Sequence, residues 1–467
     1  MGITDEERTL ARGLAGDLRK IVRAAAVVVD EDSPAEELIG KITGHLGVEF
    51  RQVVLVAQEF PPWEHGCVHR GVEAYLAERG GRAEWFGATG ANRTNEELTG
   101  ILSAARRHGG FELGAVDMAT VATGPESAEE VIQFGLVATT APDGSPAIVA
   151  VRGPIAQHGP SAVSRVEVLA ADRDTAGAIR DRIDHLARVH DVLRGQVLAF
   201  GSSEYRGNEL LTFLPRPDLS AEQVVLPAGV LPAIEDHIVG IAEHADRLRR
   251  AGQHLKRGLL LHGPPGTGKT HTVRYLMSRL SGSTVIILTG AAMRFIGKAA
   301  ELARRLQPSI LAVEDVDLVA EDRTMPGGGG ALLFSLLDAM DGIGADADVT
   351  FVLTTNRPEA LEAALRDRPG RVDLAVEIPR PDAEGRRKLI ELYARGVELR
   401  ADLEPVVAAT DGVTASFIKE LLRRAVLHEV RAGADGDRVR VGDKALTTAF
   451  RDMQDSRNSL TRSLLGS

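Results

Sequence analysis

The strongest chemical signal in the chain is a single glycine-rich stretch. It reads Gly263-Pro264-Pro265-Gly266-Thr267-Gly268-Lys269-Thr270 and fits the pattern G-x-x-x-x-G-K-[ST], between an apolar run and a helix-like run that begins at His271. Glycines let main-chain N–H groups turn toward phosphate oxygens, and a following helix directs its positive end at them. We expect Lys269 to reach the outer phosphates of ATP and Thr270 to bind Mg²⁺. Glycine-rich turns also occur without nucleotide, but the lysine, the threonine and the flanking elements favour an ATP site, with His271 at its edge.

A pair of acids, Glu314 and Asp315, follows the apolar run at 310–313. Acids at the carboxyl end of a parallel strand lie beside the phosphate-binding loop. We expect Glu314 to approach the metal and Asp315 to polarise the attacking water. The more usual order is Asp then Glu. Here the residue expected to polarise the water is the aspartate, whose side chain is one methylene shorter, and a misplaced base lowers the reaction rate, so slow hydrolysis is predicted. The alternative is a helix-capping acid cluster with Asp317, and the spacing from the loop favours catalysis.

Three further polar residues follow the next predicted strands. Asn356 comes after the apolar run 349–353, and we expect it between the outer phosphate and the water. Arg368 and Arg371 flank a Pro-Gly turn, which suits a surface that reaches the nucleotide of a neighbouring subunit. An arginine supplied in trans raises the rate by about 10³–10⁵. A lone surface arginine is more often solvated or in an ion pair, but the combination with the loop and Asn356 favours the catalytic role.

These motifs together resemble the AAA family of ATPases, part of the wider AAA+ group, over about 226–455. The resemblance implies a doubly wound core, a helical lid whose turn at 412–416 faces the nucleotide, and a ring, usually a hexamer. The region around Pro61-Pro62-Trp63-Glu64 resembles the leading region of a group of bacterial AAA proteins with no assigned role.

Phe295 and Ile296 lie in the segment Arg294-Phe295-Ile296-Gly297, between the second and third predicted core strands. In AAA proteins that thread polypeptides, a basic–aromatic–aliphatic–Gly loop occupies this place and faces the pore. The acidic pattern that usually follows it is absent here. A pore loop and a buried core position are therefore both open interpretations.

His65, Cys67 and His69 stand close together with Glu64. They could bind Zn²⁺, but the spacing is not usual for such sites, and solvent-exposed histidines at a helix start are the favoured interpretation. The chain has no His-Glu-x-x-His segment, so a fused metalloprotease of that type is excluded.

The elements that must position these residues alternate between strand and helix. The predicted core strands are 258–262, 284–288, 310–313, 349–354 and 374–378, a parallel-sheet pattern. The predicted fold class is α/β, a doubly wound phosphate-binding ATPase core with a C-terminal helical lid, preceded by an α/β N-terminal region. We expect this order: an N-terminal region at 1–125, a second α/β segment at 126–218 that could share its domain, a linker at Pro215-Arg216-Pro217, the ATPase large subdomain at 219–381, the lid at 382–455 and a flexible tail at 456–467.

Composition narrows the class of protein. The formal net charge of −11 disfavours nucleic-acid binding, and the single cysteine, Cys67, allows no intrachain disulfide and fits the cytoplasm. The first residues lack the features of a signal peptide, and no apolar run is long enough to cross a bilayer. We predict a cytoplasmic homo-oligomer, a hexamer, that is not bound to a membrane and remodels a protein client that the sequence does not identify. A slow nucleotide-gated switch or scaffold is the alternative, and a nucleic-acid motor is the weaker one.

Overall fold

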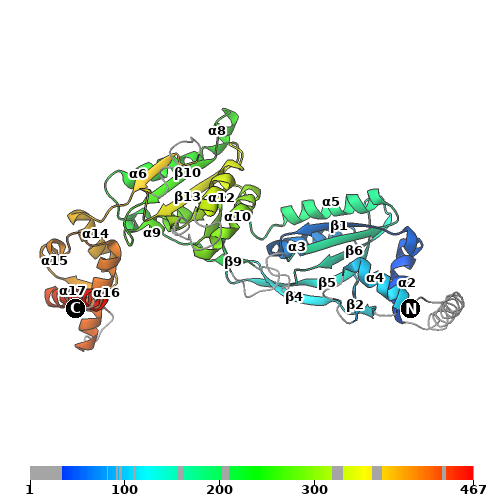
Figure 1. Ribbon diagram of the computed structural model, residues 1–467, viewed down its shortest axis with the longest axis horizontal. Helices are drawn as coiled ribbons and strands as arrows, with labels where there is room; N and C mark the ends of the chain where they lie inside the picture. Colours follow the sequence, from blue (N-terminus) through cyan, green and yellow to red (C-terminus); the bar gives the residue numbers. More distant parts are fainter. Residues whose placement is uncertain are drawn as a thin grey trace, which may run out of the picture. The chain divides into compact units, whose positions relative to one another are not determined.

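The computed structural model describes residues 34–80, 83–90, 93, 97–108, 111–155, 162–201, 210–317, 330–359, 371–433 and 438–465. The chain forms two compact units. The first comprises residues 1–192 and 201–212, and the second comprises residues 193–200 and 213–467. Both units appear in Figure 1, and each is described by itself.

The first unit is built on an antiparallel sheet. Within the described residues its strands follow the order β1-β7-β6-β5-β2-β3, and β4 pairs with β5. The strands are β1 (Val54–Phe60), β2 (Trp85–Thr89), β3 (Glu112–Gly114), β4 (Asp117–Ala122), β5 (Ala128–Thr140), β6 (Pro146–Arg152) and β7 (Ser164–Ala170). The helices are α2 (Pro34–Leu46), α3 (His65–Glu78), α4 (Leu98–His108) and α5 (Arg173–Val189). The expected second segment from 126 therefore shares this sheet with the first, up to β7.

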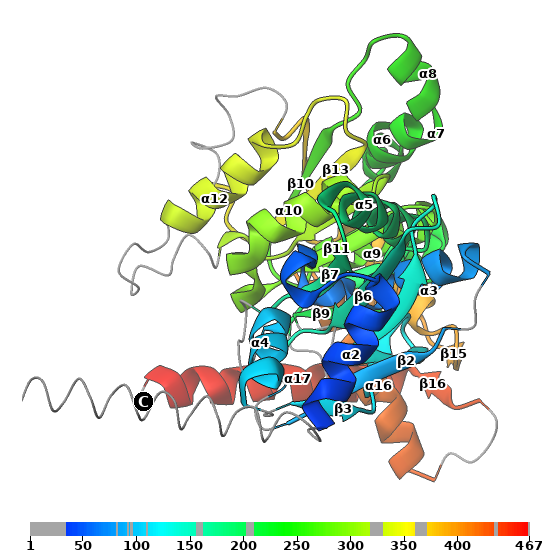
Figure 2. The ribbon, with the colours of Figure 1, turned by 90° about the vertical axis from the view of Figure 1, so that its right-hand side faces the viewer.

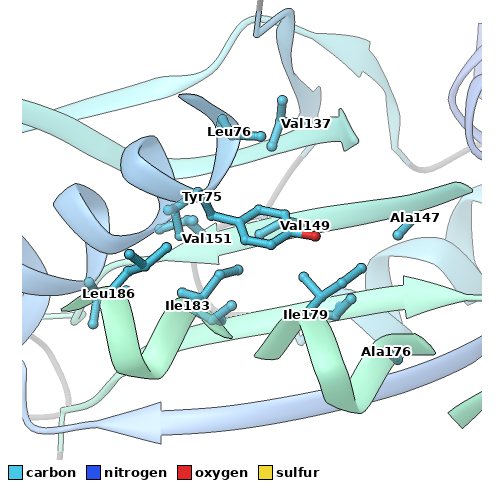
Figure 3. Packing of buried hydrophobic residues seen from close by; sticks show 14 of the residues in the cluster. Tyr75, Leu76, Val137, Ala147, Val149, Val151, Ala176, Ile179, Ile183 and Leu186 are labelled. Carbon is cyan, nitrogen blue, oxygen red and sulfur yellow. The ribbon is translucent and has the colours of Figure 1, made fainter. Parts of the chain in front are cut away.

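Alternation along the strands divides the unit into three layers. Val137, Val149 and Val168 face one side, where they pack against α3 and α5 (Figure 3). Leu136 and Ile148 face the other side and pack against α2 and α4. Figures 1 and 2 place α5 and α2 on opposite sides of the strands. Tyr75 on α3 is fully buried, and its hydroxyl donates to the carbonyl oxygen of Thr140 at 2.8 Å.

The start of α3 differs from the expectation of exposed histidines. His65 is 0% exposed and Cys67 is buried, with its thiol donating to Asp191. The hydrophobic neighbours Trp63 and Val68, on either side of His65 and Cys67 in the sequence, are buried too, which explains why this end of α3 is covered. Among the described residues no group of three or more His, Cys, Asp or Glu side chains could hold a metal ion.

Burial of His65 predicts acid sensitivity. Burial and the nearby His69 lower the pKa of His65 to about 3. Below pH 6.5 the unfolded chain takes up a proton that the folded chain does not accept until about pH 3, so stability falls as the pH drops through this window. At pH 5 the loss is about 2 kcal/mol of unfolding free energy. Denaturant unfolding of the first unit across this range checks it, and His65→Gln should flatten the slope; an unchanged slope in the variant contradicts the assignment.

The second unit contains the parallel sheet predicted from the sequence. Its described strands follow the order β14-β10-β13-β12-β11-β8-β9. The five core strands are β10 (Arg257–His262), β11 (Thr284–Leu288), β12 (Ser309–Val313), β13 (Val349–Thr355) and β14 (Leu374–Glu377), all paired in parallel. Around them lie α6 (Val230–Glu235), a π-helical turn (Asp236–Gly240), α7 (Ile241–Glu243), α8 (Ala245–Arg250), α9 (Lys269–Arg279), α10 (Ile296–Arg305) and α12 (Gly330–Asp341).

Two strands that precede the expected ATPase boundary extend this sheet. β8 (Val197–Phe200) pairs in parallel with β11, and β9 (Leu211–Leu214) follows it at the edge. Arg216 donates to the carbonyl oxygens of Met277 and Ser283, both at 2.7 Å. The segment expected to be a linker is therefore anchored to the ATPase unit, and the change of sheet lies near residue 193 rather than near 218.

The lid has its own hydrophobic core. It comprises α14 (Ala383–Tyr393), β15 (Glu398–Arg400), α15 (Leu403–Ala409), α16 (Ala415–Arg431), β16 (Arg440–Gly442) and α17 (Asp443–Leu465). The short parallel pair β15–β16 was not expected, because strands this brief carry no recognisable alternation. The helix α17 continues to Leu465, whereas a flexible tail was expected from 456.

Candidate nucleotide-binding site

The phosphate-binding loop joins β10 to α9, as the pattern predicts. Gly263, Gly266 and Gly268 all have positive φ angles, of 139°, 78° and 118°. A Cβ at Gly263 would lie 2.3 Å from the carbonyl oxygen of Ile378, so a side chain has no room there. A Cβ at Gly268 would meet nothing within 4 Å. The loop therefore adopts a conformation that suits glycine, and it leaves open space at the first turn of α9.

Lys269 lies inside the loop. It is 6% exposed, and its Nζ donates to the carbonyl oxygens of Gly263 at 2.8 Å and Pro264 at 3.0 Å. A third bond joins it to Asn356 Oδ1 at 2.8 Å. Burial lowers the pKa of Lys269, while Asp315 and Asp317 act in the opposite direction. The ammonium group is thus held in place by weak neutral acceptors, which phosphate oxygens can replace.

The two acids after β12 point to different partners. Asn356 Nδ2 donates to Asp315 Oδ1 at 3.2 Å, so Asn356 connects Asp315 to Lys269. Glu314 instead accepts a hydrogen bond from Thr270. Burial raises the pKa of Glu314, and the neighbouring Asp315 raises it further. The division places Glu314 with the threonine expected to bind Mg²⁺, and Asp315 with Asn356, which is expected between the outer phosphate and the water.

Asp315 has a left-handed backbone, with φ of 52°. Its N–H donates to Thr354 Oγ1 at 3.0 Å, and the next N–H, of Val316, donates to the Thr354 carbonyl oxygen. The end of β12 is therefore fastened to β13 on both sides of the acid. Such a conformation is uncommon outside glycine, and asparagine and aspartate tolerate it best.

Asp317, which the sequence placed only in a possible capping cluster, contacts the expected site residue Asn356. It is 6% exposed, and its Oδ1 accepts from Thr355 Oγ1 at 2.9 Å and from the Asn356 N–H at 3.0 Å. Burial alone would raise the pKa of Asp317, but these hydrogen bonds outweigh it and lower the pKa. Asp317 is thus a positioning residue for Asn356. Its place two residues after the acid pair was the available signal.

A pocket of about 120 Å³ lies next to the loop and shares Thr267 with it. Apolar side chains from the segment before α6 and from the lid line much of it, including Val225, Leu226, Pro381, Leu389 and Ala415. His271, expected at the edge of the site, contacts the Gln223 carbonyl oxygen at 2.9 Å and so holds this segment against α9. Apolar side chains beside a phosphate loop suit an adenine base. No spacing in the sequence indicated these residues.

The lid reaches the loop through the first turn of α16. The Ser416 N–H and hydroxyl both donate to the Gly266 carbonyl oxygen, at 3.1 and 3.2 Å. A Cβ at Gly266 would lie 3.0 Å from Ser416 Oγ. The turn at 412–416 therefore faces the loop, as the family resemblance implied.

Arg371 differs from the expectation of a surface arginine that reaches the nucleotide of a neighbouring subunit. It is 5% exposed, and its guanidinium donates from two nitrogens to the Asp341 carboxylate at 3.0 and 2.6 Å. This pairing raises the pKa of Arg371. The side chain is thus engaged within its own subunit. Arg368, the other arginine of the pair, lies outside the described residues.

Phe295 and Ile296 are also buried, at 8% and 3% exposure. Phe295 ends a 3₁₀ turn (Gly290–Phe295) and stacks on Phe200 of β8, with ring centroids 5.7 Å apart. The Arg294 guanidinium lies 4.7 Å from the centroid of the Phe295 ring. This geometry is that of a core position, which was the alternative to a pore loop.

The residues present fit ATP with Mg²⁺. Mg²⁺ keeps most of its waters in proteins and takes one or two carboxylate or hydroxyl ligands, as Thr270 and Glu314 could supply. The loop offers main-chain N–H groups and Lys269 to phosphates, and the pocket at Thr267 offers apolar walls. Both halves of a nucleotide thus have complementary surfaces in one unit.

Residues 259–380 match the family model described as ATPase family associated with various cellular activities (AAA). This part of the chain belongs to the AAA family of ATPases. The match begins within β10 and ends just before the lid, so it contains the loop, the acid pair, Asn356 and both arginines of the expected motifs. The 258 residues that precede the match include the first unit and the β8–β9 extension of the AAA sheet.

Similar curated proteins carry related domains. The chain is 33% identical over 232 residues to a proteasome-activating nucleotidase of Methanocaldococcus jannaschii, covering 46% of this chain and 54% of that protein. It is 31% identical over 227 residues to a cell division cycle protein 48 homolog of Archaeoglobus fulgidus, covering 46% and 31%. It is 32% identical over 263 residues to an ATP-dependent zinc metalloprotease FtsH of a Synechococcus species, covering 53% and 40%. The chain thus spans about half or less of each relative.

Within the described part of the chain, every helix is too short or too polar to cross a bilayer.

Proposed function

We propose that this protein is an ATP-hydrolysing ring ATPase that remodels a protein client. The observation that carries the proposal is the hydrogen-bonded chain from Lys269 through Asn356 to Asp315, at the loop of an AAA domain. The names of two relatives, a proteasome-activating nucleotidase and an ATP-dependent zinc metalloprotease, describe work on proteins. The sequence contains no His-Glu-x-x-His segment, so the proposal concerns remodelling and assigns no cleavage.

The residues would divide the reaction as follows. Main-chain amides of the loop and Lys269 would bind the phosphates, and Thr270 with Glu314 would hold Mg²⁺, which would supply charge neutralisation at the phosphate oxygens. Asn356 orients the attacking water, and Asp315 accepts its proton. Asp317 keeps Asn356 in place. The pocket at Val225 and Leu389 holds the base.

Arg368 is the proposed arginine finger, acting on the nucleotide of a neighbouring subunit in a hexamer. We expect Arg368→Ala to keep nucleotide affinity and to lose about 10³–10⁵ in turnover. Mixing it with Lys269→Ala subunits should restore part of the turnover, because some interfaces then combine an intact loop with an intact arginine. Phosphate release in mixed and unmixed samples checks this. Absence of recovery on mixing contradicts action across the interface.

Remodelling is tested by ATP-dependent unfolding of a tagged, folded model substrate. Phe295→Ala and Phe200→Ala remove the same ring stack, and each should destabilise the AAA unit by about 3–5 kcal/mol. If Phe295 only packs, both variants should unfold substrate equally well per hydrolysed ATP. If Phe295 also grips substrate, only Phe295→Ala uncouples unfolding from hydrolysis. No unfolding by the wild-type protein contradicts remodelling by this route.

The reversed acid pair favours one alternative function, a slow nucleotide-gated switch or scaffold. In it, ATP assembles the ring and slow hydrolysis times its disassembly. Fast turnover that rises further with an unfolded protein counts against this alternative. A nucleic-acid motor is the weaker alternative, because the net charge of −11 opposes phosphate-backbone binding. Retention on single-stranded DNA at physiological salt would support it.

A further inference from the structure

The strand β1 forms one end of the sheet in the first unit. It pairs antiparallel with β7 from Val54 opposite Ala170 to Phe60 opposite Ser164. Within the described residues no strand pairs with its other side. In an antiparallel pair, alternate residues direct their N–H and C=O groups away from the partner strand. β1 therefore presents a row of main-chain donors and acceptors to an approaching chain.

A groove of about 650 Å³ runs along the first half of β1. Val54, Leu55 and Val56 form one wall, and the first three turns of α5 form the other. The three β1 residues are partly exposed, although they are apolar. Further along, Gln58 Nε2 donates to Asp184 Oδ1 at 3.0 Å and fastens the strand to the helix. The groove is thus bounded by two elements that are held together, with α5 alongside β1 in Figure 1.

Gly177 stands in the helical wall of this groove. A glycine inside a helix is unfavourable relative to alanine, and a close packing partner can be its structural reason. Gly71 on α3 has one, because a Cβ there would lie 2.7 Å from the Ala187 nitrogen. A Cβ at Gly177 would meet nothing within 4 Å. Packing within the described structure accounts for neither Gly177 nor Gly44 on α2, but only Gly177 lines the groove, where its missing side chain leaves space for another main chain to approach.

The charges in the groove balance. Arg173 and Arg180 are matched by Asp174 and Asp181, and Arg180 bonds to Asp181. The groove therefore does not select for a partner chain of strongly positive or strongly negative net charge. A free strand edge beside a helix binds such a chain mainly through its main-chain hydrogen bonds, with pockets for alternate side chains.

We propose that the groove between β1 and α5 binds an extended segment of a client polypeptide as an added strand. The proposal rests on the proposed remodelling function and names the receptor for its client. It assigns the first unit a task before any ATP is hydrolysed. The groove recognises an unfolded or extended segment by its backbone, which suits a protein that accepts clients of varied sequence.

The test uses the full-length protein without nucleotide and a fluorescent, reduced and carboxymethylated α-lactalbumin, which cannot fold. Wild-type protein should raise its anisotropy, and Gly177→Leu should weaken binding by about tenfold or more, because leucine fills the groove. Gly44→Leu is the matched control. Gly44 also lies within a helix of the first unit and has nothing within 4 Å of a Cβ, but α2 covers the other side of the sheet.

Equal binding by Gly177→Leu and Gly44→Leu overturns the proposal, as does a Kd that depends steeply on salt. Hydrogen–deuterium exchange supplies a second readout, because probe binding should slow exchange of the β1 amides that do not bond to β7. Unchanged exchange there also overturns it. If sedimentation shows that Gly177→Leu instead abolishes self-association, the edge pairs with a second copy and the client proposal fails. Because no ATP is present, these outcomes do not depend on hydrolysis. If the protein binds a client but does not unfold it when ATP is added, the proposed remodelling function fails while the proposed binding groove stands.

Discussion

Lys269→Ala should abolish nucleotide binding at ordinary ligand concentrations. The Lys269 ammonium group is buried in the loop, where it donates to neutral carbonyl oxygens. Hydrogen bonds from the ammonium group to charged phosphate oxygens would be stronger than these. Each hydrogen bond to a charged group contributes about 1.5–3 kcal/mol. Loss of two such bonds weakens affinity about 10²–10⁴-fold. Titration calorimetry with ADP and with a non-hydrolysable ATP analogue, both with Mg²⁺, measures the change.

Lys444→Ala provides the control for Lys269→Ala. Lys444 is an exposed lysine in the first turn of α17, and its removal should leave affinity unchanged. The circular dichroism of Lys269→Ala should match that of the wild type, since the lysine makes hydrogen bonds but fills no apolar core. Retained affinity in a folded Lys269→Ala variant would remove the nucleotide site from 263–270, and with it the proposed function.

Asp315→Asn should keep ATP binding and lose most of the hydrolysis. Asparagine has the same shape and tolerates the left-handed backbone at this position, so the end of β12 should not move. It cannot accept the proton of the attacking water, and loss of such a base costs about 10²–10⁴-fold in kcat. Single-turnover measurements with saturating ATP separate the chemical step from binding and release.

Asp317→Asn is the informative comparison for Asp315→Asn. Asp317 acts through Asn356, so its replacement should reduce kcat less and should be partly tolerated, because asparagine can still accept one hydrogen bond through its side-chain oxygen. A larger loss from Asp317→Asn than from Asp315→Asn would indicate that the base has been assigned to the wrong acid. Slow wild-type turnover that neither change alters would favour a switch over a motor.

The sequence predicted the parts of the site that depend on neighbours in the chain. The core strands were placed to within a residue at each end, because each contains a short apolar run bounded by polar or turn-forming residues. Gly263–Thr270, Glu314, Asp315 and Asn356 could be brought together because the carboxyl ends of neighbouring parallel strands meet at one edge of a sheet.

The remainder depends on partners that lie far apart in sequence. Arg371 pairs with Asp341, and Phe295 stacks on Phe200, so neither residue stands where its local motif suggested. His65 resembled a surface histidine because it stands among the polar residues Glu64 and His69, although the buried Trp63 and Val68 flank it. Residues 197–200 and 211–214 were expected within the second α/β segment for the same reason, since a short apolar run does not reveal which sheet it will join.

The added strands β8 and β9 bear on how a minimal motor can be excised from this chain. A fragment cut at residue 219, where the pattern of the sequence suggests a boundary, would lack both strands and leave β11 as a bare edge. It would also lose Arg216, which binds the carbonyl groups at the end of α9, and would uncover Phe295. Bare strand edges recruit other chains, so such a fragment would tend to aggregate. A cut just before Leu193 keeps the whole sheet.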